Sequence, residues 1–349
     1  MNDTDQERIY PAEHSPRAFY QAWAADHPPT MTFASRAHRA TTWQQELRIQ
    51  LLACLGEMPQ PVELQPELVN EVDAGDHVRQ KWLLRTEPHF RLPLLLLLPK
   101  RVPAPAPAVI AVHGHGPGKV HTAGLPDAPG ADEAAADELD YGLAAVRRGY
   151  VALCHDMRGF GECVDEDHRM MAHGYSCIYS AGRSIMLGRT LLGERVWDVR
   201  RAIDFLASRP DVDAGRIACV GHSGGGTVTL LTAAVEPRLR AAVVSAYLCA
   251  WSASLYGVGH CPCNYVPGLA RLADCGDIGA LAAPTPLLVT TGTHDDIFPL
   301  AGVQRAFATV SDGYAALGAA DRVELYVGEG GHRFFGAPTW LFLERWLRG

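Results

Sequence analysis

The residues with the clearest capacity for chemistry lie in segment 216–228, which reads RIACVGHSGGGTV. Ser223 is the serine of a G-x-S-x-G pattern, placed between an apolar run that predicts a strand and a stretch with helical character. A serine on such a sharp turn has its hydroxyl lifted clear of the sheet, and small neighbours let the helix pack close to the strand. We therefore expect Ser223 to be a nucleophile; the alternative is a glycine-rich turn that only joins strand to helix.

A serine hydroxyl needs two helpers to become nucleophilic at neutral pH. One is a base within hydrogen-bond distance, and the other is a group that holds this base in the right tautomer. In the chain order serine, acid, histidine, one later loop holds the adjacent Asp295 and Asp296, and the next holds His332. Successive side chains that leave a strand tend to point in different directions, so only one aspartate can face the imidazole. For His332, the alternative is a structural histidine.

Acyl transfer also needs hydrogen-bond donors that point at the developing oxyanion, and two backbone N–H groups usually supply them. Gly224 follows the serine and would supply one donor. The second would come from the loop His113-Gly114-His115-Gly116, where glycines permit a close backbone approach, and we favour the His115 amide. For the His113 side chain we favour structural hydrogen bonds over contact with a substrate.

Three other side chains are candidates for contact with a substrate. Arg158 lies in the loop DMRGFG after another expected strand, although we favour bracing of the site through ion pairs as its role. Trp251 and Tyr265 lie in the irregular stretch 249–283, which is too long for a simple connection between elements. We expect this stretch to form a wall or cap over the site, and the sequence leaves open whether it moves.

The segment His260-Cys261-Pro262-Cys263 is a candidate for metal binding. Two thiols one residue apart and a single nearby histidine lack the paired spacing of a zinc module, so we expect no metal here and leave the role of these residues open. The sequence contains no Walker loop, dinucleotide fingerprint or HExxH motif. We therefore expect an enzyme that needs no cofactor.

The scaffold that must position these residues is predicted from hydrophobic patterning. From residue 108 onward, apolar runs that predict strands alternate with segments of helical periodicity. The expected strands are 108–112, 150–154, 217–220, 241–245, 287–291 and 323–327, and the expected helices are 133–148, 183–207, 227–235, 301–310 and 339–347. Strands separated by helices imply a parallel sheet covered on both faces. Two earlier runs, 78–85 and 92–98, predict antiparallel strands near a sheet edge.

Residues 1–75 are expected to form a helical extension that precedes one large domain, 76–349. In this extension, apolar residues recur every four positions: Trp43, Leu47, Leu51 and Leu55. Thr42 and Gln45 have the spacing of a capping box, which places the start of a helix at Thr42. We expect the apolar stripe to pack against the main domain. A dimer contact is the alternative, and the sequence leaves open whether the protein forms a homo-oligomer.

Composition excludes several classes of partner. The 349-residue chain is 48% hydrophobic, which is enough for a packed core. The formal net charge of −8 and the scattered basic residues predict no nucleic-acid partner. The longest aliphatic run, 94–98, is too short to span a bilayer, so we expect no membrane segment. Nine cysteines, an odd number, and an N-terminus without a signal pattern predict a cytoplasmic protein with free thiols.

Several of these motifs occur together in one order: HGHGPGK, DMRGFG, GHSGGG, GTHDDIFP and GGHRF. In this pattern the chain resembles the α/β-hydrolase superfamily, and within it the dienelactone-hydrolase-like and acetyl-xylan-esterase-like serine esterases. The resemblance covers about residues 76–349. It implies an α/β-hydrolase fold with a mostly parallel eight-stranded sheet and helices on both faces.

The resemblance also implies roles for individual residues. Ser223, Asp295 and His332 match the triad positions of the group, which selects Asp295 over its neighbour. The amides of His115 and Gly224 match the oxyanion hole. Dienelactone hydrolases proper carry a cysteine where this chain has Ser223, and secreted members of the group have signal peptides that are absent from this sequence.

The expected function is a serine carboxylic-ester hydrolase, with a deacetylase as one form, that cleaves a small-molecule ester through an acyl-enzyme intermediate. A peptidase or amidase of the prolyl-oligopeptidase type is an alternative, although residues 1–75 are too few for the propeller of that group. A binding protein that kept the fold and lost the chemistry is the other alternative. The acyl group and the alcohol of the substrate are left open.

Overall fold

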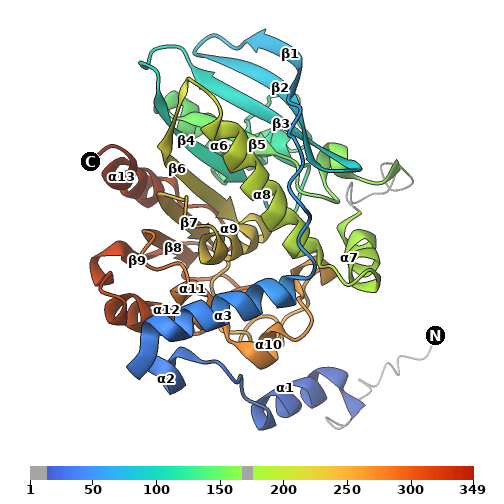
Figure 1. Ribbon diagram of the computed structural model, residues 1–349, viewed down its shortest axis with the longest axis vertical. Coiled ribbons are helices and arrows are strands. Elements are labelled where there is room, and N and C mark those ends of the chain that lie inside the picture. Colours follow the sequence, from blue (N-terminus) through green and yellow to red (C-terminus); the bar gives the residue numbers. More distant parts are fainter. Residues whose placement is uncertain (1–13, 167–175) are drawn as a thin grey trace, which may run out of the picture.

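A mixed sheet, drawn in Figure 1, forms the centre of the computed structural model, which describes residues 14–166 and 176–349. In these residues the sheet has nine strands in the order β1-β2-β3-β5-β4-β6-β7-β8-β9. The parallel part consists of β4 (Ala106–Val112), β5 (Val151–His155), β6 (Val212–His222), β7 (Ala241–Ser245), β8 (Leu287–Gly292) and β9 (Val323–Gly328). The antiparallel edge consists of β1 (Glu67–Asp73), β2 (His77–Glu87) and β3 (Phe90–Pro99). The predicted parallel sheet with an antiparallel edge is confirmed.

The expectation of eight strands is wrong by one strand, which is β1. Its residues pair with β2, from Glu67 opposite Leu83 to Asp73 opposite Val78. Every residue of β1 is exposed, so its sequence lacks the buried apolar positions by which a strand is recognised. The sheet therefore begins at residue 67, ahead of the boundary expected at residue 76.

Helices connect and cover the strands. The longer ones are α1 (Pro16–Asp26), α3 (Ala40–Leu55), α6 (Tyr141–Arg147), α7 (Cys177–Met186), α8 (Leu191–Ala207), α9 (Gly224–Val235), α12 (Leu300–Ala316) and α13 (Gly336–Leu347). The shorter ones are α2 (Phe33–Arg36), α4 (Lys119–Thr122), α5 (Ala131–Ala136), α10 (Leu269–Leu272) and α11 (Cys275–Ala280), with 3₁₀ turns η2 (Ala37–Arg39), η3 (Gly161–Cys163), η5 (Pro262–Asn264) and η6 (Ala320–Arg322). None of the helices in the described residues combines the length and apolarity needed to cross a membrane.

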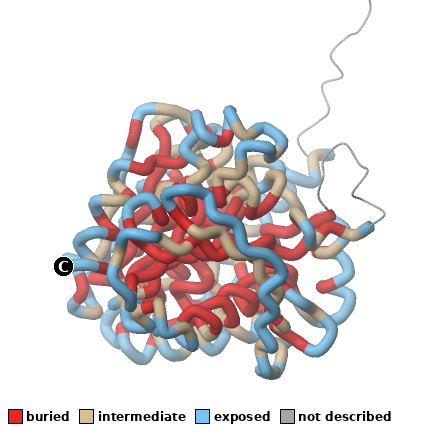
Figure 2. The backbone as a smooth tube through the Cα atoms, turned by 90° about the horizontal axis from the view of Figure 1, so that it is seen from above, coloured by how far each residue is buried: buried red, intermediate tan, exposed pale blue. Residues whose placement is uncertain are grey.

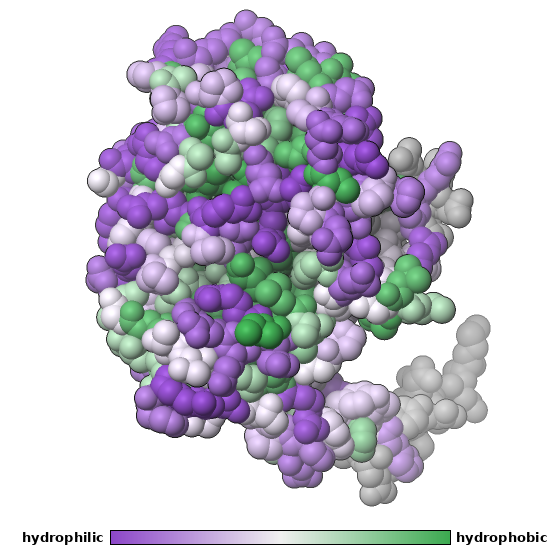
Figure 3. Space-filling view, viewed as in Figure 1, coloured by the Kyte–Doolittle hydropathy of each residue, from purple (hydrophilic) through white to green (hydrophobic). Residues whose placement is uncertain are grey.

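The core lies on both faces of the sheet. Consecutive residues of a strand point to opposite faces, so Ile110 of β4 packs in one cluster with α3, α8, α9 and α12, whereas Ala111 packs in the other with α6 and α13. Figure 2 shows these buried residues at the centre of the molecule, surrounded by exposed segments. In Figure 3, hydrophilic side chains are spread over the visible face with smaller hydrophobic areas between them. The central strands read as nearly continuous apolar runs because both of their faces are covered.

Two of the predicted helices are each divided in the structure. The span 133–148 contains the end of α5 and then α6, and Glu138 between them has a left-handed φ of 57° that interrupts the helix. The span 183–207 contains the end of α7 and then α8. Gly188, with φ 72°, ends the first, and the Thr190 hydroxyl caps the second by accepting a hydrogen bond from the Gly193 amide. The hydrophobic periodicity continues through both breaks, so the sequence pattern did not predict them.

Helix α3 buries its apolar stripe against the main domain, as predicted. Trp43, Leu47, Leu51 and Leu55 are each at most 1% exposed, and they belong to the larger core cluster. The helix begins at Ala40 rather than at Thr42, and no side chain caps it, so the predicted capping box is wrong. Burial of the stripe on this chain removes the reason to invoke a dimer contact for it.

The irregular stretch 249–283 divides into two parts. Its second part contains α11, which is buried against α9 and α12 and belongs to the core. Its first part, together with α1, lies at the molecular surface: Arg17 and Gln21 donate hydrogen bonds to the carbonyls of Gly257 and Tyr256. The part that includes residues 259–264 lies beside the candidate site and forms a wall there.

Candidate active site

Ser223 occupies a sharp turn between β6 and α9. Its backbone has φ 55° and ψ −119°, a conformation that L-residues rarely adopt, and its amide donates to the carbonyl of Ser245 at 2.9 Å. A Cβ on Gly225 would collide with the carbonyl oxygen of Val112, and one on Gly221 would collide with the carbonyl of Gly225. The glycines of the motif are therefore required for the close approach of β4, β6 and α9, and this packing holds the serine turn.

Asp295 and His332 form a buried hydrogen-bonded pair. The distance between His332 Nδ1 and Asp295 Oδ2 is 2.9 Å, and the aspartate side chain is fully buried. Its other oxygen accepts the amides of Ile297 and Phe298 at 3.0 and 2.9 Å. These contacts fix the carboxylate beside the ring, where Oδ2 can accept the Nδ1 proton and leave Nε2 as the acceptor. Asp296 is exposed to solvent, so the geometry places Asp295 against the imidazole.

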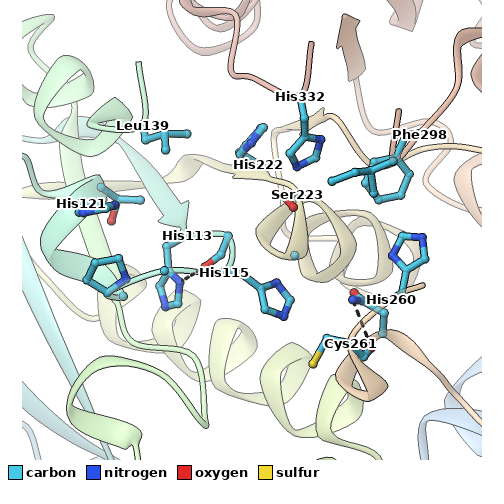
Figure 4. Close-up of a pocket in the computed structure, with 18 of the residues that line it drawn as sticks. His113, His115, His121, Leu139, His222, Ser223, His260, Cys261, Phe298 and His332 are labelled. Carbon is cyan, nitrogen blue, oxygen red and sulfur yellow. Dashed lines mark hydrogen bonds between the residues drawn. The ribbon is translucent and has the colours of Figure 1, made fainter. Parts of the chain in front are cut away.

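A cavity of about 450 Å³ opens where these loops meet. Figure 4 shows Ser223 between the imidazole of His332 and the loop that carries His113 and His115. Apolar side chains form much of the remaining surface: Leu139, Tyr141, Ile297 and Phe298. The carboxyl ends of β4, β6, β8 and β9 meet at this edge of the sheet, which is why loops far apart in sequence share the pocket.

The two residues predicted to donate to the oxyanion, Gly224 and His115, lie close together beside Ser223. Gly224 is the first residue of α9, so its N–H lies outside the intrahelical hydrogen-bond ladder. A Cβ on Gly224 would lie 3.9 Å from the backbone nitrogen of His115. A Cβ on Gly114 would lie 3.3 Å from the Cβ of Ser223, so the loop after β4 packs directly on the serine turn. Both residues line the same cavity as the serine.

Two buried histidines near Ser223 are neutral. His113 Nε2 accepts the Met157 amide at 3.0 Å, and His113 Nδ1 lies 2.6 Å from the carbonyl of Gly114. Burial lowers the pKa of His113 well below its usual range. Burial, and then the neighbouring His332, likewise lower the pKa of His222. His113 lines the pocket, but both of its nitrogens have protein partners, as the structural interpretation predicts.

Arg158 lies outside the pocket, in a buried network of ion pairs. Its Nε and Nη2 donate to Asp198 at 2.7 and 2.9 Å, and Nη1 pairs with Glu87 and, at 3.5 Å, with Glu194. Its guanidinium also lies 4.0 Å from the centre of the Phe90 ring. Burial lowers the pKa of Arg158, but the three carboxylates outweigh burial and raise it. Arg158 therefore has the bracing role that the sequence favoured, and it is not among the residues that line the pocket.

Trp251 and Tyr265 also lie outside this pocket. Trp251 is buried, and its indole N–H donates to the carbonyl of Ala273 at 2.9 Å. The Tyr265 hydroxyl donates to the carbonyl of Leu255 at 3.4 Å, and the ring lines surface grooves on the side of α1. The wall was expected to contribute these aromatic residues because they are large and lie in a long irregular stretch. The fold instead packs them away from Ser223.

The wall contributes three residues to which the sequence assigned no contact with the pocket. Cys261 and Asn264 line the pocket, and Asn264 Oδ1 accepts a hydrogen bond from the Thr227 hydroxyl of α9 at 3.2 Å. His260 also lines it, with its Nε2 2.8 Å from the hydroxyl of Ser254. The sequence holds no local signal for these contacts, because they join the wall to residues of distant elements.

Three cysteines and a histidine meet beside the pocket. His115 Nε2 lies 3.4 Å from Cys263 Sγ and 3.9 Å from Cys177 Sγ, and the sulfurs of Cys177 and Cys261 are 3.2 Å apart. One atom from each side chain lies within 4.8 Å of the corresponding atoms of the others. The expectation of no metal rested on the spacing of residues 260–263 alone. The fold adds two candidate ligands from other segments, His115 and Cys177.

We call these four side chains, His115, Cys177, Cys261 and Cys263, the thiol cluster. Burial lowers the pKa of His115, but hydrogen bonds with Cys261 and Cys263 outweigh it and raise the pKa to about 9. Hydrogen bonds with Cys177 and Cys261 lower the pKa of the Cys263 thiol. Hydrogen bonds with Cys261 and Cys263 raise the pKa of the Cys177 thiol, so within the cluster negative charge is favoured on Cys263 rather than on Cys177.

The chain is similar in sequence to known proteins over most of its length. The Abhydrolase family matches residues 14–326. A curated relative, "Putative hydrolase YtaP" of Bacillus subtilis (strain 168), is 29% identical over 314 residues, which cover 86% of this chain and 99% of the relative.

Solved structures with the same fold include carbohydrate esterases. A "putative acetyl xylan esterase" from Bacteroides fragilis NCTC 9343 has a TM-score of 0.78 and 21% identity, covering 90% of this chain and 82% of that one. A glucuronoyl esterase from Solibacter usitatus has a TM-score of 0.65 and 18% identity, covering 86% and 92%. At these identities the similarity establishes the fold, which is the one that the sequence motifs implied.

Proposed function

This chain belongs to the Abhydrolase family, and from that premise we propose that it is a serine carboxylic-ester hydrolase with Ser223 as nucleophile. The observation that carries the proposal is the hydrogen bond between buried Asp295 and His332 Nδ1, in the loops that meet at the serine turn. This arrangement leaves His332 Nε2 as the proton acceptor.

The proposed reaction has two steps. Ser223 Oγ attacks the carbonyl carbon of the ester while His332 Nε2 takes the hydroxyl proton, and Asp295 stabilises the resulting imidazolium. The amides of Gly224 and His115 receive the negative charge on the carbonyl oxygen. The ester C–O bond breaks and the alcohol leaves with the proton from His332. Water then attacks the acyl-enzyme with His332 as base, which releases the carboxylic acid and restores Ser223.

The pocket supports a small, uncharged ester as substrate. Its volume is about 450 Å³, and among the described residues that line it there is no Lys, Arg, Asp or Glu. The apolar and neutral polar groups of this lining suit an acyl group and a neutral alcohol. An acetyl ester meets these requirements, and the acetyl xylan esterase among the structural relatives makes deacetylation the first activity to test.

A reducing location such as the cytoplasm belongs to the same proposal. All nine cysteines are free, including the three that lie close together in the thiol cluster. Free thiols at such short range persist where disulfide formation is disfavoured.

Covalent labelling tests the nucleophile directly. A fluorophosphonate should add one phosphonyl group to the intact protein at Ser223, because this serine combines an elbow with a base and oxyanion donors. Ser223→Ala should take up no probe and should hydrolyse neither a small acetate ester nor its matched amide. Wild-type protein that is folded and yet neither labelled nor active on either substrate would refute the proposal, and faster cleavage of the amide would make it a peptidase or amidase.

A further inference from the structure

We propose that His115, Cys177, Cys261 and Cys263 form a site for one zinc ion, coordinated by three thiolates and one imidazole. The four side chains come from three segments: the loop after β4, the first turn of α7, and the wall at η5. Figure 4 shows His115 and Cys261 on the same side of the pocket, below Ser223. This inference needs no assumption about the reaction that the protein catalyses.

The distances in the cluster are close to those of a tetrahedral site. Zinc–sulfur bonds of about 2.3 Å and zinc–nitrogen bonds of about 2.0 Å place sulfur atoms about 3.8 Å apart and sulfur about 3.5 Å from nitrogen. The Cys177 and Cys261 sulfurs are separated by 3.2 Å, and His115 Nε2 lies 3.4 Å from Cys263 Sγ and 3.9 Å from Cys177 Sγ. The four ligand atoms lie within 4.8 Å of one another, so shifts of up to about 1 Å would complete the polyhedron.

The donor types select zinc. Three cysteines and one histidine are a ligand set of structural zinc sites, and thiolates disfavour the oxygen-preferring magnesium and calcium ions. Clustering within 4.8 Å leaves space for one ion rather than for an iron–sulfur cluster. With four protein ligands the site is closed, so the ion would hold segments together and would not activate water.

Charge and burial agree with this assignment. Binding of Zn²⁺ with release of the three thiol protons gives a complex of net charge −1 with a neutral imidazole. The Phe160 ring lies 5.1 Å from the His115 ring and 5.0 Å from the buried guanidinium of Arg195, so one aromatic ring separates the histidine from this positive charge. Cys177 and Cys263 are 0% and 1% exposed, so two of the ligands are already removed from water.

A disulfide is the other chemistry open to neighbouring thiols. Its S–S bond is about 2.0 Å long, and it would join only two of the three sulfurs. The 3.2 Å distance between the Cys177 and Cys261 sulfurs is that of unbonded atoms, and the histidine nitrogen contributes nothing to a disulfide. The metal site accounts for all four side chains.

The site would have a positioning effect on the pocket. His115 supplies a ligand through its side chain and, if the proposed function holds, an oxyanion donor through its backbone amide. Zinc would therefore tie the oxyanion loop to the wall. Loss of zinc should lower kcat by about 10-fold to 100-fold, within the range for loss of metal-site support.

Metal content of the purified full-length protein is the primary test. Elemental analysis should find one zinc per chain, and treatment with a mercurial thiol reagent should release it stoichiometrically to a chromogenic chelator. Apoprotein reconstituted with Co²⁺ should show thiolate-to-cobalt charge-transfer absorption and the visible bands of a tetrahedral site. Substoichiometric zinc together with no cobalt spectrum, or a Cys177–Cys261 disulfide in the protein as isolated, would overturn the proposal.

Matched cysteine variants locate the site. Cys263→Ser and His115→Gln should lose zinc or bind it at least 10-fold more weakly. Cys275→Ser, at a buried cysteine outside the cluster, and Cys54→Ser, at a partly buried one, should keep it. If circular dichroism shows that Cys263→Ser does not fold, the site is tested with Cys261→Ser, at a partly buried position, and with the cobalt spectrum of the wild-type protein. Zinc retained at full stoichiometry in His115→Gln and Cys261→Ser alike would refute the assignment.

One further variant separates this inference from the proposed function. Ser223→Ala removes the proposed nucleophile and none of the proposed ligands, so it should be inactive and carry one zinc. A fully active wild-type protein without zinc would leave the esterase proposal standing and refute the metal site. A zinc-loaded wild-type protein without hydrolase activity would support the metal site and refute the esterase proposal.

Discussion

The two sides of the pocket are held in different ways. Ser223, Asp295 and His332 directly follow β6, β8 and β9, so the paired strands of the sheet determine where these side chains lie. The opposite wall, residues 259–264, contains no strand, and its link to the oxyanion loop runs through the side chains of the thiol cluster. Groups on the sheet side should thus be rigid in the isolated chain, whereas the wall depends on what its thiols bind. The predictions that follow test this contrast.

Asp295→Asn should have the largest effect of these four predictions. The amide keeps the shape of the carboxylate but stabilises the wrong imidazole tautomer, a change that lowers kcat by about 10⁴-fold in a serine protease. Asp296→Asn is the matched control and should stay within a few-fold of wild type, because its side chain is exposed. Both variants are compared on one ester after circular dichroism verifies the fold. A large loss in Asp296→Asn with near-normal Asp295→Asn would reverse the assignment.

A methyl group should be tolerated on the wall and not on the sheet side. Gly225→Ala places a Cβ against the Val112 carbonyl, where the backbone cannot yield without moving α9, and it should lower the unfolding free energy by about 3 kcal/mol or more. Gly259→Ala meets nothing within 4 Å and should change the unfolding free energy by less than about 1 kcal/mol. Denaturant titration of both proteins gives the comparison, and equal stability would contradict it.

Acid should weaken the fold through a histidine beneath the pocket. His155, at the end of β5, is fully buried, neither ring nitrogen has a hydrogen-bond partner in the described residues, and burial lowers its pKa to about 4. The unfolded chain binds this proton near pH 6.5 and the folded chain only near pH 4. Stability is therefore lost as the pH falls through this window, by about 3 kcal/mol for this group.

His155→Leu removes this linkage, so its unfolding free energy should fall less steeply than that of wild type between pH 6.5 and 4. A shallower dependence remains in the variant, because burial also lowers the pKa of His113 and His222. Urea titrations at several pH values measure both curves. Parallel curves for the two proteins would show that His155 is protonated in the fold, contrary to its burial.

Asn264→Ala should have the smallest effect and should act on the wall. It removes the hydrogen bond between Asn264 and the Thr227 hydroxyl, which is worth about 1 kcal/mol. KM for a small ester should rise by a few-fold with little change in kcat, since the sheet side is untouched. Thr227→Val removes the other partner and also the contact of that hydroxyl with the Ser223 carbonyl, so it should give the same rise in KM and a larger loss of kcat. A loss confined to kcat would mean that the wall and the triad are coupled.

The sequence by itself determined the features that depend on local chemistry. The turn at Ser223 was predicted because the close packing of β4, β6 and α9 requires glycines, and these glycines form one short recognisable motif. The central strands were predicted because burial on both faces makes them continuously apolar. Asp295 and His332 were selected as loop residues after strands, and the resemblance to a known group chose between Asp295 and its exposed neighbour.

Local sequence patterns did not predict features that depend on contacts with distant residues or that involve no buried side chains. Exposed β1 has no buried face to leave a pattern, and the breaks before α6 and α8 lie within continuous helical periodicity. The partners of Arg158 could not be named from its own loop, because its carboxylates come from β2 and α8.

Only the tertiary structure assembled the thiol cluster. His115 and Cys263 are 148 residues apart in the chain, and Cys177 and Cys261 are 84 apart, so no spacing rule could join them. Metal-ligand motifs in sequences come from pairs on one turn or hairpin, whereas here the sheet brings a strand-end loop, a helix start and a wall segment to one point. The chemistry of each side chain is fixed by its residue type, whereas the packing of distant segments determines which side chains come together in one site.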